Sequence, residues 1–240
     1  MIVFLHGVPE TSAIWRKVQA AVGVESVALD LPGFGSPRPD GFTSTKDEYV
    51  EWVAGQLDQY DTVDLVGHDW GAGLVYRLAA TRPLRSWVAD VGNVVHPDYV
   101  WHSLAQTWQT PGDGEAAVAR MLATPREDTA ARYTATFRLD EADALEMASG
   151  VDETMGSSIL SLYRSATPNP HAHWGPWTRV EAPGLVLHPT DDPFCDEAMG
   201  RAVARTLGAG FRTIEASHFW PYQAPEQAAE VLTEFWASAR

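Results

Sequence analysis

The residue types best suited to chemistry stand in one short stretch, Gly67-His68-Asp69-Trp70-Gly71. Two glycines on either side of a reactive side chain indicate a turn too tight for neighbouring side chains, with a strained central residue. Asp69 at the centre is ionised at neutral pH and needs no base to make it a nucleophile. A carboxylate attacks carbonyl groups poorly but is competent in displacement at an sp³ carbon. The stretch therefore predicts displacement at carbon, with an alkyl ester on Asp69 as the intermediate.

Two later segments offer the groups that would hydrolyse such an ester. A histidine oriented by a carboxylate can act as a general base toward water. His218 follows a predicted strand near the C-terminus, and two adjacent carboxylates, Asp191 and Asp192, follow the predicted strand that includes Leu185–His188. Consecutive residues leaving a strand point apart, so only one of the two carboxylates can orient His218. For Asp192 the alternative is a turn-capping role ahead of Pro193.

Hydrolysis of the ester also needs hydrogen-bond donors that stabilise the negative charge on the ester oxygen. The segment His6-Gly7-Val8-Pro9-Glu10 follows the apolar run Ile2–Leu5. A backbone turn there can aim the N–H of Val8 at the same point as the N–H of Trp70. Each such donor contributes about 3 kcal/mol to the stability of a tetrahedral oxyanion. We therefore predict an oxyanion hole made of Val8 and Trp70.

Strands alternating with helices must position these residues. We predict strands at residues 2–5, 26–31, 63–67, 87–91, 183–188 and 211–215. Helices are predicted at residues 13–21, 45–60, 74–80 and 197–207, and from about residue 225 to the C-terminus. Such alternation implies a mostly parallel sheet of about six strands with helices on both faces. Ligands bind such sheets at the carboxyl ends of the strands, where all four segments described above begin.

One block interrupts this alternation. From Asp98 to Arg179 the pattern indicates several helices and no strand, as in Thr154–Ala166, where apolar residues gather on one side. An all-helical block inside an alternating pattern implies an inserted lid. We therefore predict a core made of residues 1–97 and 180–240, and a helical lid subdomain over residues 98–179.

Composition bounds the range of partners. The 240 residues are 45% hydrophobic, enough for a sizeable core, and the formal net charge of −15 disfavours nucleic acid and anionic membranes as partners. Cys195 is the only cysteine, so no intrachain disulfide can form. The apolar start Met1–Gly7 lacks a basic region and is too short to span a bilayer. We expect a soluble, cytoplasmic protein.

His171-Ala172-His173 could suggest a metal, but no third ligand follows at useful spacing, so we expect no metal site.

Three motifs together resemble the α/β-hydrolase superfamily, in its branch with an aspartate nucleophile. Gly67–Gly71 matches the GHDWG of epoxide hydrolases and haloalkane dehalogenases, and His6–Glu10 looks like the HGxPE of epoxide hydrolases. Asp30-Leu31-Pro32-Gly33-Phe34-Gly35-Ser36 is similar to their DxxGxGxS loop. The resemblance covers the core on both sides of the lid. It implies an α/β-hydrolase fold that here begins at what is normally the third strand, with the leading strands missing.

The resemblance also implies a catalytic triad of Asp69, Asp192 and His218, in the chain order of this superfamily. Asp192 directly precedes Pro193-Phe194, as the acid does in epoxide hydrolases. Some dehalogenases carry the acid after an earlier strand, where this chain has Asn93, which cannot ionise. Asp192 is therefore the acid that we predict.

The lid is where the two chemistries differ. Opening an epoxide creates an alkoxide that needs a proton, and Tyr163 in Leu160–Arg164 resembles the activating tyrosine of epoxide hydrolases. The second such tyrosine has no counterpart, because its place falls on Trp101 or Leu104. Expelling a halide instead needs N–H donors, which Trp70 together with Trp101 or Trp108 could supply.

We predict a hydrolase that needs no cofactor and acts with water on a small apolar organic substrate, an epoxide in the first place. A haloalkane or haloacid dehalogenase with the same triad is the second hypothesis. A catalytically silent binding protein on the same scaffold is the third. Under each hypothesis, a homodimer is the assembly that we consider for this protein.

Overall fold

A parallel sheet of six strands runs through the centre of the computed structural model, which describes residues 1–171 and 173–239. Ala172, in the histidine pair considered above for a metal, lies outside the described residues, as does Arg240. The strand order is β2-β1-β3-β4-β5-β6, and every neighbouring pair is parallel. The strands are β1 (Ile2–Leu5), β2 (Ser26–Leu29), β3 (Asp64–Gly67), β4 (Ser86–Ala89), β5 (Gly184–Pro189) and β6 (Gly210–Ile214). The predicted parallel sheet of about six strands is confirmed, with strand ends that differ by one or two residues.

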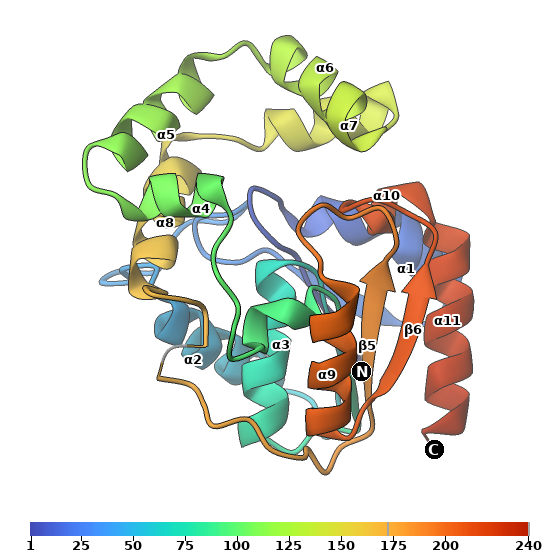
Figure 1. The fold of residues 1–240 in the computed structure, drawn as a ribbon. Helices are drawn as coiled ribbons and strands as arrows, with labels where there is room; N and C mark the ends of the chain where they lie inside the picture. The colour runs from blue at the N-terminus through green and yellow to red at the C-terminus, as the bar shows by residue number, and fades with distance from the viewer. Residues whose placement is uncertain (172, 240) are drawn as a thin grey trace.

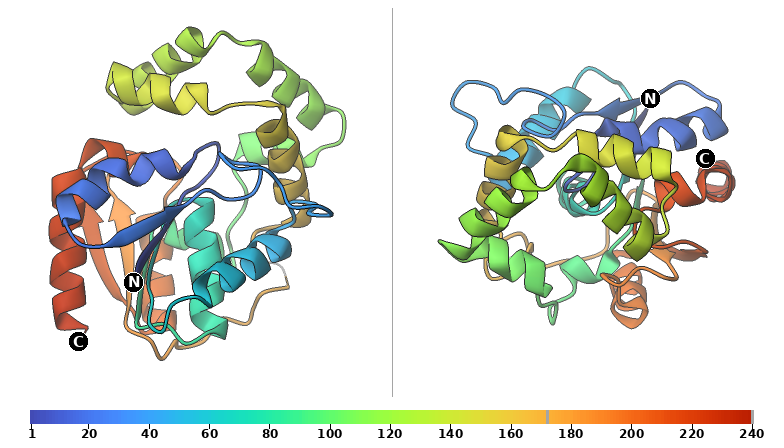
Figure 2. Two further views of the ribbon diagram at one scale, coloured as in Figure 1. Left: turned by 180° about the vertical axis from the view of Figure 1, so that it is seen from behind. Right: turned by 90° about the horizontal axis from the view of Figure 1, so that it is seen from above.

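Helices cover both faces of this sheet, as a parallel sheet requires (Figures 1 and 2). On one face lie α1 (Arg16–Val22) and α11 (Pro225–Ser238), which pack against each other. On the other lie α2 (Lys46–Leu57), α3 (Trp70–Thr81) and α9 (Glu197–Leu207). Short helical turns complete the core: η1 (Ser12–Trp15), η2 (Gly92–Val95) and α10 (Trp220–Gln223). Strands β1, β3, β4 and β5 are buried along their whole length because both of their faces are covered.

The start of α2 illustrates how the sequence sets these elements. The Thr45 hydroxyl accepts from the N–H of Glu48 while the Glu48 carboxylate accepts from the N–H of Thr45. This reciprocal capping satisfies two N–H groups that a helix start leaves free. The helix therefore begins at Lys46, one residue after the predicted start.

Between β4 and β5 the described residues form five α-helices that lie over the carboxyl ends of the strands (Figure 1). They are α4 (Ser103–Gln109), α5 (Asp113–Ala123), α6 (Arg126–Phe137), α7 (Glu141–Ser149) and α8 (Glu153–Ser165). We call them the helical insertion. α4 and α5 pack on α8, α6 packs on α7, and Lys17 of α1 holds the buried Asp143 of α7 through an ion pair of 2.5 Å. None of the helices in the described residues is long and apolar enough to cross a membrane.

Candidate active site

The turn between β3 and α3 holds Asp69 in a strained conformation, with φ of +51°. A Cβ atom at Gly67 would lie 2.4 Å from the Gly71 carbonyl oxygen, and one at Gly71 would lie 2.3 Å from that of Leu5. Neither position has room for a side chain, because the backbones of β1, β3 and α3 meet there. The two glycines let this turn lift Asp69 to the carboxyl edge of the sheet.

The loop after β1 approaches Asp69 closely. The Val8 N–H donates to Asp69 Oδ1 at 2.9 Å. A Cβ atom at Gly7 would lie 2.4 Å from the Cβ of Asp69, so only glycine permits this approach. Trp70 is the first residue of α3, where backbone N–H groups have no carbonyl partner within the helix. Of the two predicted donors, Val8 thus contacts the Asp69 carboxylate, and Trp70 directly follows Asp69 in the chain.

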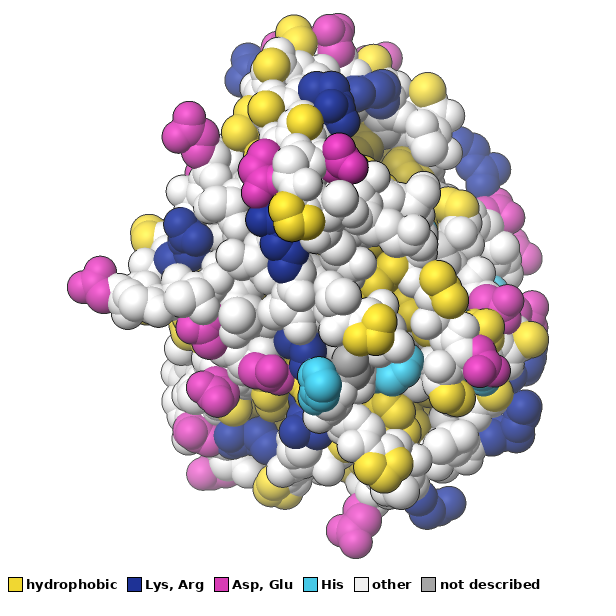
Figure 3. Space-filling view, turned by 60° about the vertical axis from the view of Figure 1, so that its left-hand side comes forward, with side chains coloured by type: hydrophobic (Ala, Val, Ile, Leu, Met, Phe, Trp, Pro, Cys, Tyr) yellow, Lys and Arg dark blue, Asp and Glu magenta, His cyan; other side chains and the backbone are white. Residues whose placement is uncertain are grey.

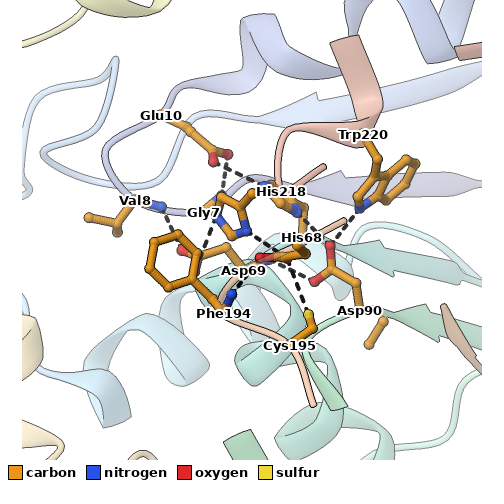
Figure 4. Close-up of polar contacts among 12 residues, drawn as sticks. Gly7, Val8, Glu10, His68, Asp69, Asp90, Phe194, Cys195, His218 and Trp220 are labelled. Atoms are coloured by element: carbon orange, nitrogen blue, oxygen red, sulfur yellow. Dashed lines mark hydrogen bonds and ion pairs between the residues drawn. The ribbon is translucent and has the colours of Figure 1, made fainter. Parts of the chain in front are cut away.

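His218 lies beside this carboxylate (Figure 4), and Asp192 contacts the imidazole of His218. His218 Nδ1 lies 2.8 Å from Asp192 Oδ2, and its Nε2 lies 3.9 Å from Asp69 Oδ2. Asp192 Oδ1 accepts from the N–H of Phe194 at 2.8 Å, and its Oδ2 accepts from the Cys195 thiol at 3.1 Å. The structure thus brings the three residues of the predicted triad together.

Charge and burial act in opposite directions on these groups. Burial alone would raise the pKa of Asp192, but the charge and hydrogen bond of His218 outweigh it and hold that pKa below its usual value. Burial alone would lower the pKa of His218, yet Asp192 raises it above the usual value. Burial raises the pKa of Asp69. Asp191, by contrast, is exposed and pairs with Arg138 on the surface, so Asp192 is the carboxylate that faces His218.

A second buried group lies beneath the triad. His68 Nδ1 lies 2.5 Å from Asp90 Oδ2, and its Nε2 lies 3.1 Å from Glu10 Oε1. All three side chains are almost fully buried. Burial lowers the pKa of His68, but the two carboxylates outweigh this and raise it well above its usual value. We did not predict Asp90 from the sequence, although it directly follows β4 at the edge where functional side chains gather.

Glu10, His68 and His218 have ligand atoms within 4.8 Å of one another, near enough to hold a metal ion. A metal needs a ring nitrogen with a free lone pair, whereas a protonated imidazole carries hydrogen on both nitrogens. Since two carboxylates keep His68 protonated, the arrangement is better explained as an ion pair than as a metal site.

A cavity of about 780 Å³ opens above Asp69 and His218, beneath the helical insertion. Its wall is mostly apolar, with Trp108, Tyr163 and Phe194 among the lining residues. Figure 3 shows hydrophobic side chains between the insertion, at the top, and the core below, with acidic and basic side chains interspersed over the surface. A cavity of this kind fits a small, largely apolar molecule.

Comparison with known proteins agrees with this geometry. A model of the alpha/beta hydrolase family matches residues 2–231. The chain belongs to the alpha/beta hydrolase family. It is 26% identical to a haloalkane dehalogenase of Bradyrhizobium diazoefficiens over 72% of this chain and 57% of that protein. It is 39% identical to epoxide hydrolase 2 of Siraitia grosvenorii over 35% of this chain and 29% of that protein. The chain thus spans little more than half of the first relative and less than a third of the second.

The crystal structure of a haloalkane dehalogenase from Bradyrhizobium elkani superposes with a TM-score of 0.75. The two share 20% sequence identity over 99% of this chain and 90% of that one. This likeness confirms the alpha/beta hydrolase fold.

Two of the predicted leaving-group residues of this alpha/beta hydrolase, Trp108 and Tyr163, lie in the helical insertion, and Trp101 lies just before its first helix. Tyr163 of α8 borders the same cavity as Asp69 and packs against Trp70, Trp101 and Trp108, with ring centroids 4.7–5.4 Å apart. Burial, and then the charge of Asp69, raise the pKa of Tyr163 well above its usual value. Its hydroxyl therefore stays protonated in the cavity that it shares with Asp69.

The tryptophans differ in what their indole N–H groups contact. Trp101 donates to the carbonyl of Ala166 at 3.0 Å, so the prediction that it donates to a leaving group is not supported. The indole N–H of Trp70 is buried and makes no hydrogen bond of ordinary length among the described residues, although its interaction with the Tyr163 hydroxyl lowers the pKa of Tyr163. Trp108 lines the cavity beside Tyr163. Which way an indole points is decided by tertiary packing, which the sequence pattern does not contain.

Two further residues at this site were not predicted. Tyr99 lines a small pocket with Asp69 and Trp70, and burial followed by the charge of Asp69 raises its pKa. His102 borders both this pocket and the main cavity, and burial lowers its pKa to about 4. Its Nδ1 accepts from the N–H of Ala105 at 3.3 Å, so the neutral ring carries its hydrogen on Nε2. Neither belongs to a sequence motif, since both lie in the segment that connects η2 to the first helix of the insertion.

Proposed function

We propose that this chain is a hydrolase in which Asp69 attacks an sp³ carbon of the substrate and forms an alkyl ester. The observation that carries the proposal is the setting of the Asp69 carboxylate. One of its oxygens accepts from the Val8 N–H at 2.9 Å, and the other lies 3.9 Å from His218 Nε2. A carboxylate held in this way presents an oxygen to the cavity and has a base nearby for the second step.

In the second step, water attacks the carbonyl carbon of the Asp69 ester. His218 takes a proton from this water, and Asp192 stabilises the resulting imidazolium through the bond of 2.8 Å. The N–H groups of Val8 and Trp70 stabilise the oxyanion that develops on Asp69, each by about 3 kcal/mol. The product leaves with an oxygen that came from Asp69, while the oxygen of water enters the carboxylate.

An epoxide is the substrate that we favour, and a vicinal diol is then the product. Ring opening creates an alkoxide, which needs a proton as the carbon–oxygen bond breaks. Tyr163 supports this substrate because its protonated hydroxyl shares the cavity with Asp69. The bond from Trp101 to Ala166 supports it further, since it removes one of the N–H donors that a halide site would use.

An organohalide is the second candidate, and one observation favours it. The indole N–H of Trp70 makes no hydrogen bond of ordinary length among the described residues and belongs to a residue that borders the small pocket beside Asp69. A halide ion that leaves the carbon attacked by Asp69 would accept a hydrogen bond from this N–H. The reaction would release halide and an alcohol through the same ester.

The insertion completes the proposed site. We infer that residues 98–179 form a lid subdomain on a core made of residues 1–97 and 180–240. Packing of Trp108 and Tyr163 over Asp69 supports this division, because the apolar wall of the cavity comes largely from the insertion. A lid of this kind excludes bulk water from the alkylation step.

Trapping the ester tests the proposal. The His218→Gln variant is mixed with a panel of terminal and internal epoxides and short organohalides, and the intact mass is measured. We expect a stable adduct that proteolysis assigns to Asp69, and none in Asp69→Ala. A single turnover of the wild type in H₂¹⁸O should give product with ordinary oxygen and label in Asp69.

The product identifies the leaving group. Diol without halide release supports the epoxide, whereas halide release supports the second candidate. If no compound gives an adduct while the variant remains folded and the cavity binds apolar dyes, the chain is a binding protein on this scaffold.

A further inference from the structure

Asp90 makes three contacts that all end on segments of the candidate site. Its Oδ1 accepts from the backbone N–H of Asp69 at 2.9 Å. Its Oδ2 accepts from the indole N–H of Trp220 at 2.6 Å and lies 2.5 Å from His68 Nδ1. Trp220 stands two residues after His218. One carboxylate at the end of β4 therefore joins the nucleophile turn to the loop that carries the base (Figure 4).

The charge of this carboxylate is neutralised in a particular way. Asp90 is fully buried, and a buried charge persists only when it is paired and hydrogen-bonded. Its cationic partner is His68, which is itself fully buried and has Glu10 on its other side. Glu10 is held in turn by the N–H of Gly7 at 2.8 Å. The two carboxylates share one imidazolium.

This imidazolium lies against the reacting groups. The rings of His68 and His218 have centroids 4.8 Å apart. Burial is the largest influence on the two reacting groups, raising the pKa of Asp69 and lowering that of His218. The positive charge of His68 lowers the pKa of both. It thus favours the ionised nucleophile and the neutral base, which are the forms that the reaction uses.

We propose that Asp90 is a positioning residue for the reaction of Asp69: it holds the amide of the nucleophile and keeps His68 positively charged beside His218. The inference rests on the proposed function, because it holds that the charge of His68 favours the ionised Asp69 and the neutral His218 which that reaction uses. Titratable groups around His68 and His218 come from every neighbouring segment: His6 and Glu10 after β1, Asp69 in the β3–α3 turn, Asp90 after β4, His102 before α4 and Asp192 after β5. Of the two carboxylates that contact His68, Asp90 is the one that also holds the backbone N–H of Asp69.

The Asp90→Asn variant tests this role because it keeps the shape and removes the charge. With less negative charge beside it, His68 should lose its proton in the neutral range. The pKa values of Asp69 and His218 should then rise, so the acid limb of the pH profile moves to higher pH by about one unit. The neutral amide oxygen of Asn should hold the Asp69 N–H less firmly than the carboxylate does, which should also slow ester formation, by up to about 100-fold. A residue that only stabilised the fold would not move the pH profile.

Two measurements make the test specific. Rapid-quench kinetics follow formation and hydrolysis of the Asp69 ester from pH 5 to 9. Nuclear magnetic resonance of ¹⁵N-labelled histidine reports the protonation of His68 in the wild type and the variant. The matched control is Asp64→Asn, another buried aspartate, which lies at the opposite end of β3 and bonds Arg85 and Ser86. It should lower stability and leave the acid limb in place.

An acid limb that stays in place in Asp90→Asn overturns the proposal. So does a neutral His68 in the wild type at pH 7, a result that needs no variant to fold. If the wild type forms no ester with any substrate, the proposed function fails and this inference fails with it. That outcome is recognisable because it is seen before any substitution at Asp90.

Discussion

Replacing Asp192 by Asn should stop the reaction after its first step. Asp192 Oδ1 accepts from the Phe194 N–H at 2.8 Å, so the amide oxygen of Asn must take this position. The amide NH₂ then faces His218 Nδ1 and forces the ring hydrogen onto Nε2, the nitrogen that has to accept a proton from water. In serine proteases the same substitution of the orienting acid costs about 10⁴ in rate. That factor corresponds to about 5 kcal/mol of transition-state stabilisation.

The two steps should respond differently. Ester formation needs an ionised Asp69 and no base, so it should change little, and the ester should accumulate to one equivalent per protein. Rapid quench followed by intact mass measurement gives both rates. Removing the charge of Asp192 also lowers the pKa of His218, because Asp192 is the main group that opposes the effect of burial on that pKa. The residual hydrolysis should therefore keep its plateau to lower pH than in the wild type. Equal slowing of both steps, or turnover at the wild-type rate, would refute the assignment of Asp192.

Further predictions concern the leaving group, the turn and acid stability. Tyr163→Phe should slow epoxide opening by about 10²–10⁴ in single-turnover assays and leave halide release unchanged, if Tyr163 donates the proton. Gly71→Ala should fail to fold or lose several kcal/mol in urea unfolding, because its Cβ would lie 2.3 Å from a carbonyl oxygen. Gly73→Ala in the same helix meets nothing within 4 Å and should stabilise by about 0.5–1 kcal/mol. His68 outweighs the effect of burial and lowers the pKa of Glu10. The ionised Glu10 therefore stabilises the folded state above the unfolded-state pKa of this carboxyl, and that stabilisation is lost as the pH falls below that pKa. Glu10→Gln should therefore lose less stability than the wild type between pH 7 and pH 3 in urea unfolding.

The sheet and the triad could be predicted because their signals are local in the chain. Each strand is a short apolar run, and Asp69, Asp192 and His218 each follow one at the edge where parallel strands end. Element ends were less certain, since Ser86–Ala89 rather than residues 87–91 forms β4. Where a strand ends depends on its neighbours in the sheet.

The side of the site near the helical insertion could not be predicted in the same way. Trp101 donates its indole N–H to the carbonyl of Ala166 instead of directing it into the cavity. Tyr99 and His102 border the site from a connecting segment that has no motif. Asp90 was missed because the partners of its carboxylate come from two other segments, the β3–α3 turn and the segment after β6. Side-chain direction and long-range pairing are properties of the folded chain, so single-sequence patterns record them poorly.

The position of the helical insertion has a consequence for how the chain folds and varies. Trp87 of β4 pairs with Gly184 of β5, although the whole insertion lies between them in the sequence. Closing so long a loop costs little free energy, because the cost grows only with the logarithm of loop length, by about 0.6 kcal/mol per doubling. It slows folding more than it weakens the fold, since distant segments must meet before their contacts form. This seam can therefore accept helices of other lengths and sequences while the sheet keeps its register. Substrate range and core stability can then change independently of each other in this fold.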